Sequence, residues 1–212
     1  MTQETWSAVD RYITDLFVPP DAALNAALRA SEAAGFPAIS VSPPQGKFLH
    51  WLARALGARA ALELGTLGGY STIWLAWALP AGGRLITLEA DTKHAEIARA
   101  NIARAGLTSI VELRLGRALD TLPKLAAEGR GPFDLIFIDA DKPNYADYFT
   151  WALKLSRRGT VIIGDNVIRQ GAVIDTAGDD PRLLGVRRFN ELVAAERRVS
   201  ATAIQTVGAI GI

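Results

Sequence analysis

Short apolar segments alternate with helical patterns through most of the chain, and this alternation constrains the fold more than any other feature. The expected strands are apolar on both faces and cover residues 60–64, 84–88, 110–115, 134–138, 160–164 and 201–207. The helical patterns between them cover residues 72–79, 92–105, 119–127, 145–155 and 179–195. Strands of this kind, separated by helices, predict an α/β fold in which helices cover both faces of a mostly parallel sheet.

Three further helical patterns precede the first expected strand, over residues 12–17, 21–34 and 43–56. Asp21 and Ser42 are the predicted N-caps of the last two. These helices either form a lid or wall beside a substrate or pack as ordinary helices, and the sequence favours neither. Because no break in composition is visible, we expect a single domain, with leading helices over residues 1–57 and a Rossmann-like core over residues 58–212.

Composition excludes several classes of protein. The chain has 212 residues, 50% of them hydrophobic, which is enough for one buried core. A formal net charge of +1 does not suggest an extended nucleic-acid surface, and the absence of cysteine excludes disulfides, thiolate zinc sites and a cysteine nucleophile. No apolar run approaches the roughly 20 residues that span a bilayer, and no apolar signal core is visible, so we expect a cytoplasmic protein.

A glycine-rich turn follows the first expected strand. The segment ALELGTLGGYST places Gly65, Gly68 and Gly69 between a strand and a helix, where glycine permits a sharp turn and the close approach of a ligand. Taken alone, the turn is equally consistent with a plain connection. Glu89 ends the next strand, where its carboxylate can accept hydrogen bonds from both ribose hydroxyls of an adenosine cofactor. Glu63 precedes the turn and can bind an ammonium group, directly or through water, which favours S-adenosylmethionine over NAD.

Acidic side chains end two later strands. FDLIFIDADKPNY carries Asp139 and Asp141, and TVIIGDN carries Asp165 and Asn166. Ligands of open α/β sheets bind outside the carboxyl ends of the strands, so Asp139, Asp165 and Asn166 converge if the two strands are neighbours. Oxygen ligands suit a hard divalent cation, Mg²⁺ first, with Mn²⁺ or Ca²⁺ as alternatives. The competing interpretation is that these acids merely cap strand ends or loops.

A divalent cation at this place suits methyl transfer to a phenol. The phenol, with a pKa of about 10 like that of tyrosine, is mostly protonated at neutral pH, and a bound cation favours its oxyanion. Lys142 follows Asp139 by three residues, and nearby positive charge together with burial favours a neutral amine that can act as general base. The alternative is a surface lysine paired with Asp141 or Asp147.

Three ordered motifs, ELGTLGGYST, FIDADKPNY and GDNVIRQG, resemble the cation-dependent O-methyltransferase family that includes catechol and caffeoyl-coenzyme A O-methyltransferases. The resemblance covers residues 39–171. It implies a class I methyltransferase fold with a seven-stranded sheet, methyl transfer to one hydroxyl of a vicinal diol on an aromatic ring, and a homodimer. It implies metal ligation by Asp139, Asp165 and Asn166, with Lys142 as the general base that contacts substrate. The implied cofactor contacts are Val41, Glu63, Gly65, Thr66, Ser71, Glu89, Ala118, Asp139 and Asp141.

The chain departs from the family pattern at several places. Arg117 stands where the family often has Asp, and Gln170 stands where plant members carry an Asn that contacts substrate. Gln170 is therefore a candidate substrate contact, but specificity for coenzyme A esters does not follow. The final residues GAIGI lack the family's usual Asp-Gly-aromatic stretch, so we expect a truncated last strand.

Two other functions compete with this interpretation. Some relatives methylate a hydroxylated uridine in transfer RNA, which would use the arginines 182, 187, 188, 197 and 198, and the near-neutral charge argues against it. A non-catalytic cofactor-binding protein would have no need of Asp139, Lys142, Asp165 and Asn166 together.

Overall fold

The computed structural model describes residues 3–175 and 178–204, which form an α/β fold around a parallel sheet. Its strands lie in the order β3-β2-β1-β4-β5, so the chain crosses over between β3 and β4. The strands are β1 (Ala60–Leu64), β2 (Arg84–Glu89), β3 (Val111–Leu115), β4 (Phe133–Ile138) and β5 (Ser156–Gly164). All four pairings between neighbouring strands are parallel, which confirms the fold class predicted from the alternation.

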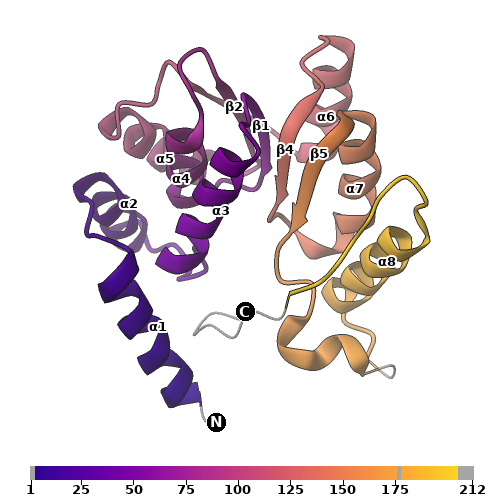
Figure 1. The fold of residues 1–212 in the computed structure, drawn as a ribbon, viewed down its shortest axis with the longest axis horizontal. Helices are drawn as coiled ribbons and strands as arrows, with labels where there is room; N and C mark the ends of the chain where they lie inside the picture. The colour runs from indigo at the N-terminus through magenta and orange to yellow at the C-terminus, as the bar shows by residue number, and fades with distance from the viewer. Residues whose placement is uncertain (1–2, 176–177, 205–212) are drawn as a thin grey trace.

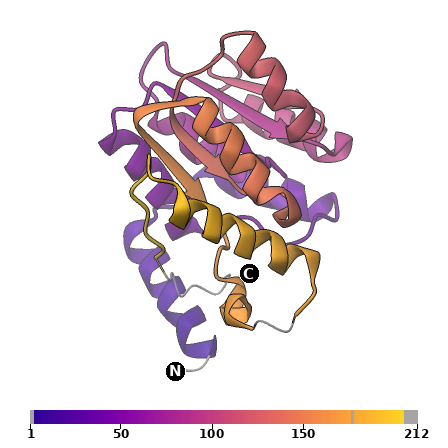
Figure 2. The same ribbon diagram turned by 90° about the vertical axis from the view of Figure 1, so that its right-hand side faces the viewer.

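Helices cover both faces of this sheet (Figure 1). The α-helices are α1 (Gln3–Phe17), α2 (Ala22–Ala33), α3 (Pro43–Ala55), α4 (Tyr70–Ala78), α5 (Thr92–Arg104), α6 (Ala118–Ala127), α7 (Tyr145–Lys154) and α8 (Pro181–Ala195). Two short 3-10 helices follow β4 and β5, η1 (Lys142–Asn144) and η2 (Arg169–Ile174). The Asp21 carboxylate accepts hydrogen bonds from the amides of Ala23 and Leu24, which confirms the predicted cap of α2. Figure 2 views the face covered by α7 and α8.

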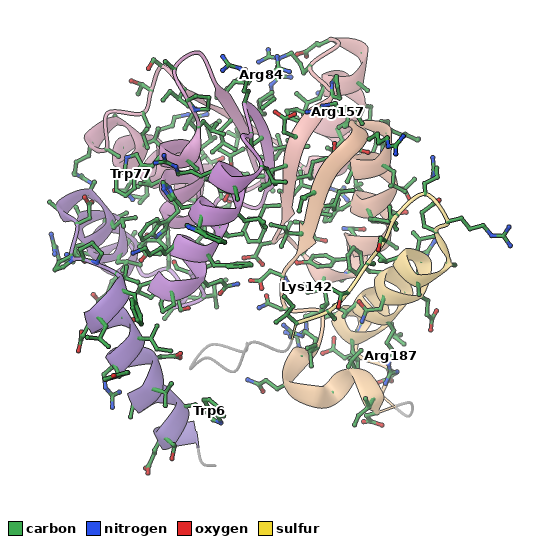
Figure 3. All side chains as sticks on the ribbon, in the orientation of Figure 1. Trp6, Trp77, Arg84, Lys142, Arg157 and Arg187 are labelled. Carbon is green, nitrogen blue, oxygen red and sulfur yellow. The ribbon has the colours of Figure 1, made fainter. Side chains whose placement is uncertain are left out.

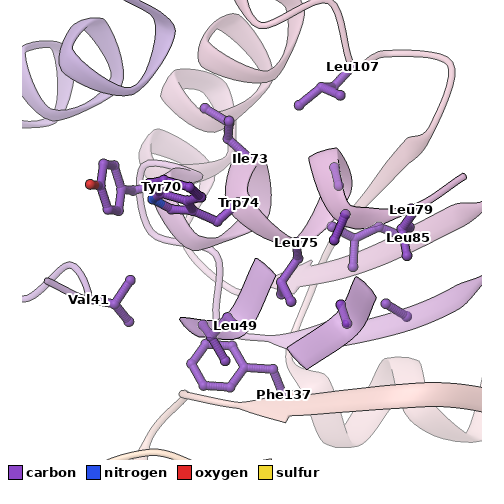
Figure 4. Close-up of a cluster of buried hydrophobic side chains, with 14 of the residues drawn as sticks. Val41, Leu49, Tyr70, Ile73, Trp74, Leu75, Leu79, Leu85, Leu107 and Phe137 are labelled. Atoms are coloured by element: carbon purple, nitrogen blue, oxygen red, sulfur yellow. The ribbon is translucent and has the colours of Figure 1, made fainter. Parts of the chain in front are cut away.

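Strand periodicity divides the core into two clusters. Because successive side chains of a strand point to opposite faces, Leu85 and Phe137 pack with the helices α3 and α4, as the cluster in Figure 4 shows. Ile86 and Ile138 belong to the opposite cluster, beneath α6, α7 and α8. Continuous apolar strands were needed for this arrangement, since both faces of the sheet are buried.

The carboxyl-terminal strand expected over residues 201–207 is not observed in its described part. Residues 201–204 belong to no strand, and residues 205–207 lie outside the described residues. β-branched residues favour a strand only where a neighbouring edge pairs with them, and in the described part of the chain nothing pairs with 201–204. The sheet therefore has five strands within residues 3–175 and 178–204, against the seven that the resemblance implies. No helix of the described residues is long and apolar enough to cross a membrane.

Candidate active site

The carboxyl ends of β1, β4 and β5 meet at one edge of the sheet. Leu64 is in register with Ile138, and Ile138 with Gly164, so the residues that follow these strands are neighbours. A cavity of about 410 Å³ lies there. Among the residues that line it are predicted site residues from six segments of the chain: Val41, Gly65, Thr66, Ser71, Glu89, Ala118, Asp139, Asp141, Lys142, Asp165 and Asn166.

The glycines of the turn serve internal packing as well as the cavity. Gly65 has φ +94, and a Cβ there would lie 2.1 Å from the carbonyl oxygen of Asp139. A Cβ on Gly68 would lie 1.9 Å from the Ser31 hydroxyl. Gly65 and Gly68 are thus required because β4 and α2 approach the turn closely. The sequence pattern alone left these glycines open between ligand approach and a plain connection.

Glu63 lies one layer behind the cavity rather than on its surface. It is fully buried and does not line the cavity, so contact of its carboxylate with a ligand would pass through Ser71 or a bridging water. Odd-numbered residues of β1 face α3 and α4, and the Glu63 carboxylate accepts hydrogen bonds from Ser71 (2.6 Å), Thr72 (2.6 Å) and Thr87 (2.7 Å). Burial raises the pKa of Glu63 to about 7, although the three hydroxyls oppose the shift. Ser71 does line the cavity and connects Glu63 to it.

Glu89 joins the end of β2 to the glycine-rich turn. One carboxylate oxygen accepts from the amides of Thr66 (3.2 Å) and Leu67 (2.8 Å), and the other from the amide of Asp91 (2.9 Å). The His94 ring nitrogen Nδ1 lies 3.5 Å from Glu89, and both residues line the cavity. Sequence reasoning assigned no role to His94; its place in the first turn of α5, just after Glu89, was the available signal.

Lys142 is buried between the sheet and α8 (Figure 3). Its Nζ donates to Asp139 Oδ1 (3.0 Å) and to the Tyr145 hydroxyl (2.5 Å). The same hydroxyl lies 3.0 Å from the carbonyl oxygens of Ile138 and Asp165, so Tyr145 connects Lys142 to the ends of β4 and β5. Burial raises the pKa of Tyr145, which keeps the phenol protonated. The alternative of a surface lysine paired with Asp141 or Asp147 is wrong.

Asp165 shares the cavity with Asp139. Its Oδ1 accepts from the Asn166 amide (2.9 Å) and from Gln45 Nε2 (2.9 Å). Burial and the charge of Asp139 together raise the pKa of Asp165 to about 6, while Lys142 opposes the shift. Two mutually repelling carboxylates beside the Asn166 amide form an oxygen donor set that fits a hard divalent cation. Within the described residues, no third His, Cys, Asp or Glu side chain joins Asp139 and Asp165 to form a metal cluster. The donor set therefore consists of two carboxylates and one amide.

Gln170 is not part of the lining. It is exposed, whereas its neighbour Arg169 lines the cavity. Both residues have positive φ (50 and 54), and this turn of the backbone separates the two side chains. The sequence analysis assigned no role to Gln45, which lies in the first turn of α3, three residues after its N-cap Ser42. The structure directs its amide to Asp165, 120 residues away in sequence.

Comparison with known proteins identifies the family. Residues 21–211 match the model of the O-methyltransferase family. The chain is 58% identical to a catechol O-methyltransferase of Niastella koreensis over 98% of this chain and 94% of that protein. It is 52% identical to a catechol O-methyltransferase of Mycobacterium tuberculosis over 96% of this chain and 90% of that protein.

Solved structures agree with this result. An O-methyltransferase from Bacillus cereus, solved in complex with SAH, superimposes with a TM-score of 0.96 at 60% identity, over 98% of this chain and 94% of that one. An O-methyltransferase from Streptomyces achromogenes, solved in complex with SAM, gives a TM-score of 0.95 at 52% identity, over 99% of this chain and 94% of that one. This chain therefore belongs to the O-methyltransferase family.

Proposed function

We propose that this enzyme transfers the methyl group of S-adenosylmethionine to one hydroxyl of a catechol-type aromatic small molecule, with the help of a divalent cation. The observation that carries the proposal is a single cavity lined by the glycine-rich turn, Glu89, Asp139, Lys142 and Asp165. Two relatives named catechol O-methyltransferase and two solved structures that contain SAH or SAM support the choice of substrate and cofactor.

The cofactor would occupy the end of the cavity beside β1 and β2. Glu89 would accept hydrogen bonds from the ribose hydroxyls, and Ala118 would lie beside the adenine. Ser71 and the Glu63 carboxylate behind it would bind the ammonium group of the methionine part. This placement leaves the sulfonium facing the ends of β4 and β5.

The acceptor would occupy the end beside β4 and β5. Asp139, Asp165 and Asn166 would hold the divalent cation, which when bound lowers the pKa of an adjacent phenol. Lys142 accepts the proton of the reacting hydroxyl at Nζ, and Tyr145 holds Nζ in place from the opposite side. The phenolate oxygen then forms a bond to the methyl carbon as the carbon–sulfur bond breaks. Proximity of the two reactants within one cavity supplies much of the acceleration.

An assay with labelled S-adenosylmethionine, catechol and Mg²⁺ tests this proposal. We expect transfer that stops with excess chelator and returns with added Mg²⁺. Asp165→Ala should abolish turnover and leave cofactor binding measurable by calorimetry, whereas Asp147→Ala, an exposed acid on α7, should behave like the wild type. Undiminished methylation in excess chelator would exclude the cation, and failure to methylate any vicinal diol would overturn the substrate assignment.

A transfer-RNA substrate has less support. Arg182 pairs with Asp180 and Arg198 with Glu196, so two of the five clustered arginines are already neutralised by adjacent acids. Arg187 donates to the carbonyl oxygen of Val173. The cluster is therefore a poor phosphate-binding surface.

A homodimer is also part of the proposal. Tyr12, Leu16 and Phe17 of α1 and Trp51 of α3 are 58–67% exposed, and a second copy of the chain would bury them. Light scattering after gel filtration should give the mass of a dimer, and Leu16→Asp with Trp51→Glu should shift it toward the monomer. A monomeric wild type would contradict this part. The cytoplasmic location stays a prediction from the sequence.

A further inference from the structure

The cavity lining contains one guanidinium, that of Arg169, which forms no ion pair in the described residues. Its charge contributes, after the hydrogen bonds of Arg182, to the lowered pKa of Asp180. Four carboxylates line the cavity, those of Glu89, Asp139, Asp141 and Asp165, against two basic side chains, Lys142 and Arg169. Of these two, only the Arg169 guanidinium is permanently charged. Lys142 is already bonded to Asp139. Arg169 forms no ion pair or side-chain hydrogen bond within residues 3–175 and 178–204. An unpaired guanidinium in the lining is available to a ligand.

The backbone holds Arg169 in an unfavourable but fixed conformation. Arg169, Gln170 and Gly171 have φ of 50, 54 and 88, in the left-handed region that residues with a Cβ rarely adopt. Helix α8 fixes the loop on both sides of this turn. Asn190 Nδ2 donates to the carbonyl oxygen of Val167 (3.0 Å), and Arg187 Nε donates to that of Val173 (3.0 Å). Such strain persists only where the surroundings maintain it, and it is common at ligand-binding sites.

The topology places Arg169 at the acceptor end of the cavity. Arg169 follows β5, three residues after Asn166, whereas Gly116 and Ala118 follow β3. β3 and β5 are the opposite edges of the described sheet. Arg169 therefore lies away from the adenine end and beside the strands that carry Asp139, Asp165 and Lys142.

We infer that Arg169 binds an anionic substituent of the acceptor, so that the preferred acceptors are catechols that carry a carboxylate. This inference rests on the proposed function and narrows its substrate class. A guanidinium binds a carboxylate through two parallel hydrogen bonds and favours a planar arrangement. Elsewhere the four carboxylates of the lining repel an anionic acceptor. Arg169 thus fixes which edge of the aromatic ring faces Lys142 and the acids.

The test compares two acceptors with the same ring and hydroxyls, 3,4-dihydroxybenzoate and its neutral methyl ester. With saturating S-adenosylmethionine and Mg²⁺, the wild type should prefer the acid by roughly tenfold or more in kcat/KM, the effect of one charge-assisted hydrogen-bond pair. Arg169→Met should remove that preference, and Arg169→Lys, which keeps the charge without the planar fork, should retain part of it. The two acceptors differ in the acidity of their hydroxyls, and this difference affects every protein equally. It therefore cancels when the ratio of kcat/KM for the acid to kcat/KM for the ester is compared between variant and wild type.

Arg158→Met is the matched control, because Arg158 is exposed in the amino-terminal half of β5, away from the cavity. The ratio of kcat/KM for the acid to kcat/KM for the ester should be the same in Arg158→Met as in the wild type. If Arg169→Met lowered kcat/KM equally for the acid and the ester, or still preferred the acid as the wild type does, the inference would be overturned. Methylation of the ester without any preference for the acid overturns the inference and leaves the proposed function standing. Failure to methylate either acceptor overturns both.

Discussion

Replacing Glu63 with Gln should stabilise the unliganded protein above neutral pH. Glu63 is fully buried, and burial raises its pKa from the usual 4.5 to about 7 against the opposing hydrogen bonds of Ser71, Thr72 and Thr87. An uncharged amide of nearly the same shape removes the cost of burying the charge. The hydroxyls that surround it can donate to the amide oxygen and accept from its NH₂ group.

The size of the effect follows from proton linkage. In the unfolded chain Glu63 loses its proton near pH 4.5, and in the folded protein it keeps the proton up to about pH 7. The folded state therefore binds more protons between these values, and the stability associated with Glu63 is fully present below pH 4.5 and lost as the pH rises through 7. At about 1.4 kcal/mol per pKa unit, the complete loss is up to about 3 kcal/mol. Glu63→Gln has no such loss.

Urea unfolding of both proteins at about pH 5 and about pH 8 measures this difference. We expect similar free energies of unfolding at the lower pH and a more stable variant at the higher one. Other titrating groups cancel in the difference between variant and wild type. Glu96→Gln, an exposed acid on α5, is the control and should show no pH-dependent difference.

A pH-independent difference between Glu63→Gln and the wild type would refute the reasoning. The affinity for the cofactor should fall in Glu63→Gln although its stability rises, because the ammonium of S-adenosylmethionine favours the ionised Glu63. Calorimetry at about pH 8 should therefore show weaker cofactor binding by the more stable variant.

Three further substitutions test the acceptor end. Tyr145→Phe removes the hydroxyl beside Lys142 Nζ, and we expect kcat to fall roughly tenfold with cofactor affinity unchanged in steady-state and binding measurements; an unchanged kcat would contradict a positioning role. Gly185→Ala introduces a Cβ 2.2 Å from the carbonyl oxygen of Lys142. Thermal unfolding should therefore show a loss of about 1–3 kcal/mol in the free energy of unfolding, together with lower activity. Unchanged stability would mean that α8 shifts freely. Gln45→Leu removes a hydrogen bond to Asp165 and should weaken Mg²⁺ binding by roughly tenfold in calorimetry, while equal losses of Mg²⁺ and cofactor binding would indicate general misfolding.

The sequence by itself determined the α/β class and most element bounds. Strands buried on both faces are continuous apolar runs, and caps such as Asp21 and Ser42 mark helix starts through contacts within a few residues. It also predicted that Asp139 and Asp165 meet if their two strands are neighbours, because parallel neighbours present their carboxyl ends at one edge of a sheet; the pairing of β4 with β5 meets this condition. These inferences need only periodicity and short-range geometry.

Only the tertiary structure decided how the site is assembled around those acids. Three features of the site depend on neighbouring elements that a linear pattern does not specify. They are the face of β1 to which Glu63 points, the close approach of the end of β4 that requires glycine at position 65, and the presence of Arg169 instead of Gln170 in the cavity lining. Gln45 reaches Asp165 across 120 residues. The physical reason is that local patterns set backbone conformation, whereas the direction and partner of a side chain are set by packing between elements that are distant in the chain.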